Sequence, residues 1–252
     1  MIAKESDWYK KIWSLDIKNH SWVEDTRQQT DFIINTLGLR KNQRILDLAC
    51  GFGRHSLELA RRGFQVVGAD ITKDYITDAE NAAKAEGLNA QFILSDIRDL
   101  TFDQEFDAVL NLADGAIGYL ENDNENFKIF DVIAKALKPG GKHFMDICNA
   151  EYAELYFPST SWEAGENALT LSRFEWNTET KIMLYGGKNI TYGDPLVKPE
   201  NFLGDPIRLY SHKELDGILK KRNMEIKQTY SNYYGKAETP KELQLMVYSI
   251  KL

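Results

Sequence analysis

The sequence predicts an α/β fold: a doubly wound, mostly parallel seven-stranded sheet with an antiparallel last strand. A small antiparallel β cap is expected as an insertion after the fifth strand. Two observations lead to this prediction. Short runs rich in Val, Ile, Leu and Phe alternate with amphipathic stretches up to about residue 150, which is typical of parallel strands covered by helices on both faces. Beyond that point two long runs joined by the polar turn "NTETK" indicate a hairpin instead.

The individual elements follow from apolar spacing and from glycines. Phe32, Ile33 and Leu37 recur at near-helical spacing, and Gly38 can end that helix. The same reasoning predicts helices over residues 25–39, 54–63, 72–87, 125–137 and 211–223, and strands over 44–49, 64–70, 90–96, 106–114 and 142–149. Ser211 is the expected N-cap of the last helix because Glu214 stands three residues later.

The remaining strands define the organisation of the chain. Residues 224–234 and 242–252 read as closing strands, and too few residues separate them for a crossover helix, so they must run antiparallel. We expect an N-terminal lid segment over residues 1–29, a Rossmann-like domain over 30–150 and 207–252, and an inserted cap over 151–206. The cap should contain a hairpin of residues 168–177 and 181–192, followed by an irregular, proline-punctuated connection over 194–206.

Composition and charge narrow the class of protein. The formal net charge of the 252 residues is −7, with Lys and Arg scattered along the chain, which argues against a nucleic-acid-binding surface. The two cysteines form neither a disulfide framework nor a CxxC pair. The first residues contain no long apolar run, so a cytoplasmic protein without a membrane anchor is expected.

The stretch "ILDLACGFGRHSLELARRGFQVVGAD" holds the main functional signal. A strand, a turn containing Gly51 and Gly53, and a helix form the usual approach of a backbone to a nucleotide-type ligand. Ser56 stands where the dinucleotide pattern G-x-G-x-x-G requires its third glycine, and no P-loop sequence is present. A nicotinamide dehydrogenase is therefore disfavoured, and Asp47 beside the turn would repel a pyrophosphate.

Three acids end successive predicted strands: Asp47, Asp70 and Asp96. A carboxylate at the end of the second strand can accept both hydroxyls of an adenosine ribose, and one at the end of the third can read an adenine edge. Together they indicate an adenosine ligand whose other end is cationic, such as a sulfonium or ammonium near Asp47.

Four stretches, "LDLACGFGRHSLELARRGFQVVGAD", "SDIRDL", "FDAVLNL" and "ALKPGG", resemble the motifs of the class I S-adenosylmethionine-dependent methyltransferases. The resemblance is strong over residues 30–150 and extends to the C-terminus. It implies S-adenosyl-L-methionine as cofactor, with S-adenosyl-L-homocysteine as product and no metal. Residues expected at the cofactor by this resemblance are Asp47, Ala49, Gly51, Gly53, Asp70, Ile71, Asp96, Ile97 and Asn111. Ala49 replaces the first glycine of the family pattern, which should be tolerated if its φ is negative.

The acceptor is less well indicated. The family members that modify amides and bases carry "[DN]PP[FY]" after the fourth strand, whereas this chain has "NLADGAIGYL". Asp114 and Tyr119 are the polar groups best placed to face an acceptor, with helix capping and aromatic packing as their alternatives. Candidates for acceptor contact are Tyr9, Trp22, Asp114, Tyr119, Asn149 and Tyr185; Trp13 is a further aromatic candidate in the lid segment. No general base is evident, although His20, His212, Asp114 and Tyr119 are weak candidates. No two histidines have metal-ligand spacing.

These observations predict a methyltransferase that transfers a methyl group to an O or N atom of a small molecule by in-line displacement. Because the cofactor carries a good leaving group, holding acceptor and methyl in line is the main catalytic requirement. There are two alternatives. One is a protein or RNA methyltransferase, and the other is a non-catalytic sensor of S-adenosylmethionine. The sequence indicates neither the acceptor nor the oligomeric state.

Overall fold

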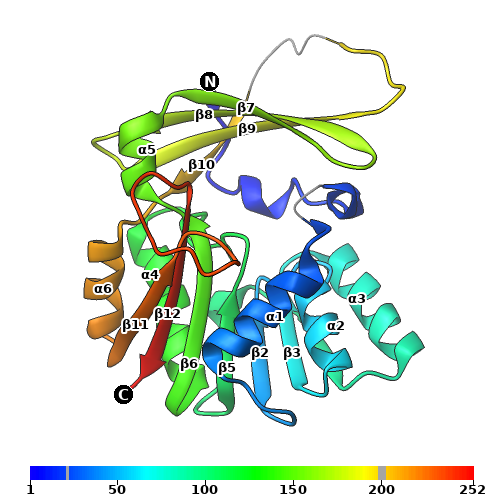
Figure 1. Cartoon of the computed structure of the whole chain (residues 1–252), viewed down its shortest axis with the longest axis vertical. Coiled ribbons are helices and arrows are strands. Elements are labelled where there is room, and N and C mark those ends of the chain that lie inside the picture. The colour runs from blue at the N-terminus through cyan, green and yellow to red at the C-terminus, as the bar shows by residue number, and fades with distance from the viewer. Residues whose placement is uncertain (21–22, 198–202) are drawn as a thin grey trace.

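The computed structural model describes residues 1–20, 23–197 and 203–252. Figure 1 shows a large sheet flanked by helices, with a second sheet across one end of it. In spatial order the strands of the large sheet are β11 (Met224–Tyr230), β12 (Gln244–Lys251), β6 (Leu137–Cys148), β5 (Phe106–Asn111), β2 (Arg44–Leu48), β3 (Gln65–Asp70) and β4 (Ala90–Leu94). Only β12 runs against its neighbours. The predicted seven-stranded, mostly parallel sheet with an antiparallel last strand is therefore confirmed.

Helices cover both faces of this sheet. They are α1 (Thr26–Leu37), α2 (Arg54–Arg61), α3 (Lys73–Glu86), α4 (Asp123–Ala136), the short α5 (Ala150–Tyr156) and α6 (His212–Lys220). Consecutive residues of β2 belong to different cores: Ile45 packs in the cluster that includes α1 and α2, and Leu46 in the one that includes α4 and α6. Since neighbouring strand residues point to opposite faces, α1 and α2 lie on one face and α4 and α6 on the other.

Several local predictions are confirmed at residue level. Gly38 ends α1 in a left-handed conformation with φ 55°, and Ser211 and Glu214 form a reciprocal capping box on α6. One strand boundary differs. β6 begins directly after α4 rather than at residue 142, and its register on β5 shifts, so that Phe106 pairs with Leu137 but Ala108 with Lys142. The Pro-Gly-Gly stretch lies in this irregular part of the strand, which an apolar pattern does not reveal.

The second sheet is larger than the predicted hairpin. Its order is β1 (Ile2–Ala3), β10 (Leu203–Arg208), β9 (Ile182–Thr191), β8 (Ala168–Asn177) and β7 (Ser159–Ala164). β8 and β9 form the expected hairpin, whereas β10 occupies part of the stretch predicted to be irregular. β10 contains Pro206, which is unusual inside a strand. β7 is mostly polar and exposed, so it shows no alternating apolar pattern.

The N-terminal segment connects the two sheets. β1 pairs in parallel with β10, and the 3-10 helices η1 (Trp8–Lys10) and η2 (Leu15–Asn19) follow it. Figure 1 shows this segment between the second sheet and the end of the large sheet where the parallel strands finish. Among the described residues no helix combines the length and apolarity needed to cross a membrane.

Candidate active site

The carboxyl ends of the parallel strands open into a cavity that encloses about 950 Å³ of empty space, including its part open to solvent. Ligands of doubly wound sheets bind at this edge. The N-terminal segment forms part of its wall through Tyr9, Trp13 and Ile17. The predicted site residues that line this cavity are Asp47, Ala49, Gly51, Asp70, Ile71, Asp96 and Ile97 from the cofactor set, and Tyr9 and Tyr119 from the acceptor set.

Asp47 is the penultimate residue of strand β2 and is buried. Its Oδ2 accepts a hydrogen bond of 2.6 Å from Ser56 Oγ. Burial raises the pKa of Asp47 to about 6, although the Ser56 hydroxyl opposes the rise. Ser56 stands where the dinucleotide pattern requires a glycine, and its hydroxyl holds the Asp47 carboxylate. A phosphate-binding turn would not place a carboxylate at this position.

The turn after Asp47 is left-handed at three residues. Gly51 and Gly53 have φ of 56° and 78°, and Ala49 has φ 54°. The condition under which alanine would be tolerated without strain, a negative φ at Ala49, is not met. A residue with a Cβ in this region is destabilised by about 1–2 kcal/mol because its Cβ approaches the following carbonyl oxygen. The turn thus keeps the backbone path of the family's glycine with an alanine in its place.

Gly53 lies apart from the cavity lining. A Cβ on Gly53 would stand 2.9 Å from Phe92 Cε1 and 3.0 Å from Ala79 Cβ. The glycine therefore allows the start of α2 to pack tightly against α3 and β4. Gly51 differs: a Cβ there would have no neighbour closer than 3.9 Å, so its backbone is open to a ligand.

Asp70 ends strand β3 and is buried. Its two carboxylate oxygens accept from backbone amides, Oδ2 from Gly51 at 2.9 Å and Oδ1 from Thr72 at 2.8 Å. Burial raises the pKa of Asp70, and these hydrogen bonds oppose the rise. The carboxylate therefore holds the glycine turn against the end of β3.

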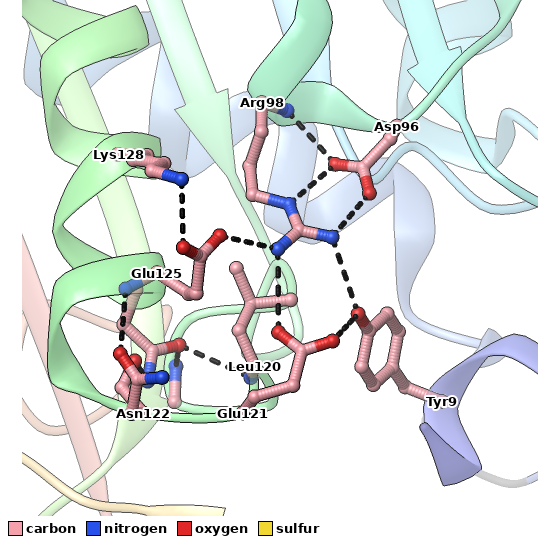
Figure 2. A network of polar contacts seen from close by, with 10 residues as sticks. Tyr9, Asp96, Arg98, Leu120, Glu121, Asn122, Glu125 and Lys128 are labelled. Atoms are coloured by element: carbon pink, nitrogen blue, oxygen red, sulfur yellow. Dashed lines mark hydrogen bonds and ion pairs between the residues drawn. The ribbon is translucent and has the colours of Figure 1, made fainter. Parts of the chain in front are cut away.

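Asp96 belongs to the polar network in Figure 2, whose hub is Arg98. Asp96 caps η4 (Ile97–Asp99) and pairs with Arg98. Asp96 Oδ2 accepts from Arg98 Nη2 at 2.6 Å, and Oδ1 accepts from Arg98 Nε at 3.0 Å. Burial alone would raise the pKa of Asp96, but its hydrogen bonds with Arg98 outweigh this and lower it. Arg98 also contacts Glu121 and Glu125. A ligand would share Asp96 with this arginine.

The same network anchors the N-terminal segment (Figure 2). Tyr9 Oη donates to Glu121 Oε1 at 2.9 Å, and Arg98 Nη2 donates to Tyr9 Oη at 3.4 Å. Burial and the Glu121 carboxylate raise the pKa of Tyr9. Tyr9 thus connects η1 to the loops that follow β4 and β5.

The segment after β5 adopts an unusual turn. Ala113, Asp114, Gly115 and Ala116 all have φ between 51° and 67°. Left-handed residues normally occur singly, and consecutive ones persist only where the surroundings hold them. Asp114 accepts from Cys148 N at 3.1 Å and from Tyr119 Oη at 3.2 Å. The turn therefore brings Asp114 and Tyr119, the two residues predicted to face the methyl acceptor, into one hydrogen-bonded pair.

Several predicted residues stand outside the cavity lining. Asn111 is buried below the turn, where its Nδ2 donates to Gly115 O at 3.1 Å. Asn149 caps α5 by accepting from Glu151 N at 2.9 Å. Tyr185 belongs to β9 of the second sheet and lies beside Phe174. His20 contacts Asn189 of the second sheet, and His212 pairs with Glu238 at 2.8 Å. Trp22 lies outside the described residues.

Arg54 is a cavity residue that sequence reasoning missed. Among the described residues that line the cavity, Arg54 is the single one of type Lys or Arg. Its Nη1 donates to Gln29 Oε1 at 2.7 Å and to Thr26 Oγ1 at 2.9 Å. Arg54 occupies the first position of α2, where a cation opposes the helix dipole. This unfavourable position of an arginine, directly after the glycine turn, was the signal from which a role at the site could have been predicted. In the described parts of the chain no cluster of His, Cys, Asp and Glu could hold a metal ion.

Comparison with known proteins agrees with this geometry. A family described as "Methyltransferase domain" matches residues 45–141, the stretch that contains the glycine turn, Asp70, Asp96 and the turn after β5. Residues 45–141 are thus similar to a methyltransferase domain. The match includes the strands that carry the cavity but neither the N-terminal segment nor the second sheet.

Individual relatives extend this comparison beyond residues 45–141. The chain is 33% identical over 159 residues to the putative methyltransferase YqeM of Bacillus subtilis, a match that spans 56% of this chain and 64% of that relative. An S-adenosylmethionine-dependent methyltransferase from Clostridium acetobutylicum aligns over 96% of this chain and 98% of its own with a TM-score of 0.75 at 19% identity. CalS10, a Micromonospora echinaspora amino pentose methyltransferase with S-adenosylmethionine bound, aligns over 98% and 95% with a TM-score of 0.63 at 17% identity. At these identities the two structures show a shared fold, which spans nearly the whole chain.

Proposed function

We propose that this methyltransferase uses S-adenosylmethionine to methylate an O or N atom of a small molecule by in-line displacement. The observation that carries the proposal is the single cavity edge at which Asp47, Asp70 and Asp96 meet the open backbone of Gly51. S-adenosylmethionine supplies an electrophilic methyl group on a cationic sulfur. The described residues fit such a group, because carboxylates outnumber cations around the cavity.

Each end of the cofactor has a chemically matched set of residues. Asp70 would accept hydrogen bonds from the ribose hydroxyls, and Ile71 would offer an apolar face to the adenine ring. Ile97 and Asp96 would bind the adenine edge, with Asp96 shared with Arg98. At the other end Asp47 would attract the methionine ammonium and the sulfonium, while Arg54 would pair with the methionine carboxylate.

A small acceptor agrees with how the cavity is covered. The N-terminal segment contributes Tyr9, Trp13 and Ile17 to its wall, and such a cover limits access for a folded protein or an RNA. The net charge of −7 also disfavours RNA. The structural relative CalS10 is described as acting on an amino pentose, which is a small acceptor of the proposed size class.

Calorimetric titration of the purified protein with S-adenosylmethionine and S-adenosylhomocysteine tests the cofactor. Both should bind at micromolar concentration, and Asp70→Ala should weaken binding by about 100-fold because it removes charged hydrogen bonds to the ribose. Asp103→Ala, an exposed carboxylate away from the cavity, is the matched control and should leave the affinity unchanged. Absence of binding, or equal affinities of the two variants, would refute the proposal.

Methyl transfer is tested separately with tritiated cofactor and a panel of small amines and alcohols. Transfer of label to one of them is expected. Tight cofactor binding with persistent failure to transfer label would favour the sensor. Labelling of proteins or RNA in place of small molecules would favour the other enzymatic alternative.

A further inference from the structure

The left-handed turn over residues 113–116 is held from several directions. Asn111 Nδ2 donates to Gly115 O, and Asp114 N donates to Asp146 O at 2.8 Å. After the turn, Asn126 Oδ1 accepts from the backbone amides of Gly118 and Leu120 at 3.0 and 3.2 Å. Such over-determination is typical of backbone strain kept for a functional purpose. Ala113, Gly115 and Ala116 of this turn line the cavity, and Asp114, which is not itself a lining residue, is hydrogen-bonded to the lining residue Tyr119.

Asp114 has hydrogen-bond donors but no counter-ion. Cys148 N and Tyr119 Oη donate to its two oxygens, and within the described residues no Lys, Arg or His forms an ion pair with it. Its surroundings disfavour the charged form and raise the pKa of Asp114 to about 6, although both hydrogen bonds oppose the rise. A desolvated carboxylate is best stabilised by a cation with N–H donors.

Other nearby groups also accept rather than donate. Asn111 Oδ1, at the base of the turn, is buried and has no hydrogen-bond partner in the described structure. In the second sheet Asp205 pairs with Lys4 at 2.5 Å, and the charge of Asp205 contributes to the raised pKa of both Tyr119 and Tyr185. In the described structure Asp205 has Lys4 as its counter-ion, so the carboxylate beside Tyr119 without one is Asp114, and an anionic methyl acceptor is disfavoured there.

Aromatic rings complete the surroundings. The Tyr119 ring lies 4.9 Å from the Trp8 ring and is nearly parallel to Trp13, with centroids 6.3 Å apart and planes at 14°. Tyr119, Trp13 and Tyr9 line the cavity. Faces of Trp and Tyr attract organic cations, so the rings and the carboxylate favour the same class of ligand.

We propose that the methyl acceptor is an organic amine, which binds as its ammonium ion against Asp114 and the rings of Tyr119 and Trp13. This inference rests on the proposed methyltransferase function and decides between its N and O alternatives. An ammonium nitrogen has no free lone pair and must lose one proton before it can act as a nucleophile. The carboxylate of Asp114, which is reached from the cavity through Tyr119, is proposed to accept that proton.

The test uses three probes that share one ring and differ in charge: benzylamine, which is protonated at neutral pH, benzyl alcohol and benzoate. The full-length protein is first saturated with S-adenosylhomocysteine, and each probe is then titrated by calorimetry. Benzylamine should bind at millimolar concentration or better, benzyl alcohol at least about tenfold more weakly, and benzoate not measurably.

Variants locate the binding site. Asp114→Asn keeps an oxygen for the Cys148 amide and should weaken benzylamine about tenfold, because a charged hydrogen bond becomes a neutral one. Asp103→Asn is the matched surface control and should change nothing. Tyr119→Phe keeps the ring but removes the hydroxyl, so it should retain most of the affinity, whereas Tyr119→Leu should lose it.

The outcomes separate this inference from the proposed function. If S-adenosylhomocysteine does not bind, the proposed function fails and the amine assignment fails with it. If the product binds but benzylamine does not, or if benzyl alcohol or benzoate binds as tightly, the amine assignment alone is overturned. Equal benzylamine affinity in Asp114→Asn and the intact protein would also overturn it. Folding of each variant is checked by its unchanged affinity for S-adenosylhomocysteine.

Discussion

At the scale of single residues, Ala49 illustrates a conflict between side chain and backbone. Its φ of 54° lies in the region that favours glycine, yet the residue lines the cavity beside Gly51. The neighbouring glycine turn and the hydrogen bond from Gly51 N to Asp70 impose this path. The local geometry of the ligand site is therefore retained at the expense of some stability.

Replacement of this alanine should reveal that expense. Ala49→Gly is expected to raise the free energy of unfolding by about 0.5–1 kcal/mol, because relief of the left-handed strain exceeds the extra entropy of the unfolded glycine. Ala69→Gly is the control, since Ala69 is buried in β3 without a positive φ. This variant should lower the free energy of unfolding. Urea denaturation measures both; a loss of stability in Ala49→Gly would contradict the account.

The buried carboxyl of Asp146 should make stability depend on pH. Burial raises its pKa to about 7 in the folded protein, although the hydrogen bond of 2.8 Å from Tyr233 Oη opposes the rise. In the unfolded chain the pKa is about 3.9. Between these values the folded state binds more protons than the unfolded state, so the free energy of unfolding falls as pH rises from about 4 to about 7.

The expected contribution is on the order of 4 kcal/mol. Asp146→Asn removes the titrating group and leaves an oxygen for Tyr233, so the variant should gain stability relative to the intact protein between pH 5 and pH 8. Denaturant titrations at the two pH values measure the difference. Asp103→Asn should show no such gain. A constant difference between Asp146→Asn and the intact protein would refute the assignment.

At the scale of elements, the turn after β5 depends on contact with β10. Gly118 has φ 87°, and its amide oxygen accepts from Arg208 N at 2.8 Å. A Cβ on Gly118 would lie 2.0 Å from Arg208 O. The large sheet and the second sheet are thus joined by backbone contact next to the residues proposed to bind the acceptor.

A methyl group at this position should disrupt that contact. Gly118→Ala is expected to lower the free energy of unfolding by roughly 3 kcal/mol, since the clash is with backbone that cannot turn aside. Gly87→Ala is the matched control: its φ is 65° and a Cβ there has no neighbour within 4 Å, so it should cost only about 1 kcal/mol. Thermal and urea denaturation measure the difference, and equal losses would show that the contact contributes little.

At the scale of the whole molecule, the cavity is assembled from segments distant in the chain. The N-terminal segment lies between the two sheets (Figure 1), and Tyr9 joins it to the Arg98 network (Figure 2). The N-terminal segment and the carboxyl end of the large sheet line the cavity, so the covering of the site depends on how this segment docks between the two sheets.

Loss of one hydrogen bond should loosen that docking. Tyr9→Phe removes the donor to Glu121, and hydrogen exchange in residues 8–19 should become about fivefold faster, as expected for roughly 1 kcal/mol of lost stabilisation. Exchange in β2 and β5 should stay unchanged. Tyr192→Phe, which removes an exposed hydroxyl bonded to Gly165 O, is the control. Unaltered exchange at residues 8–19 would show that the aromatic contacts of Trp8 and Trp13 suffice.

The sequence by itself determined the large sheet, most helix boundaries and the strand ends that carry Asp47, Asp70 and Asp96. Apolar periodicity, glycine stops and caps are local properties, and parallel strands necessarily bring their carboxyl ends to one edge. These features predicted the glycine turn and the three acids at one edge without knowledge of any contact between distant residues, and the family resemblance supplied the rest of the cofactor set.

Only the tertiary structure decided the covering of that edge. β7 and β10 have no alternating apolar pattern, and β1 is two residues long, so their pairing into one sheet depends on neighbours far away in the sequence. The positive φ at Ala49 and at residues 113–116 is likewise imposed by long-range hydrogen bonds that override local preference. Arg54 and the pairing of Asp114 with Tyr119 became visible for the same reason: the charge and burial around a side chain depend on the whole fold.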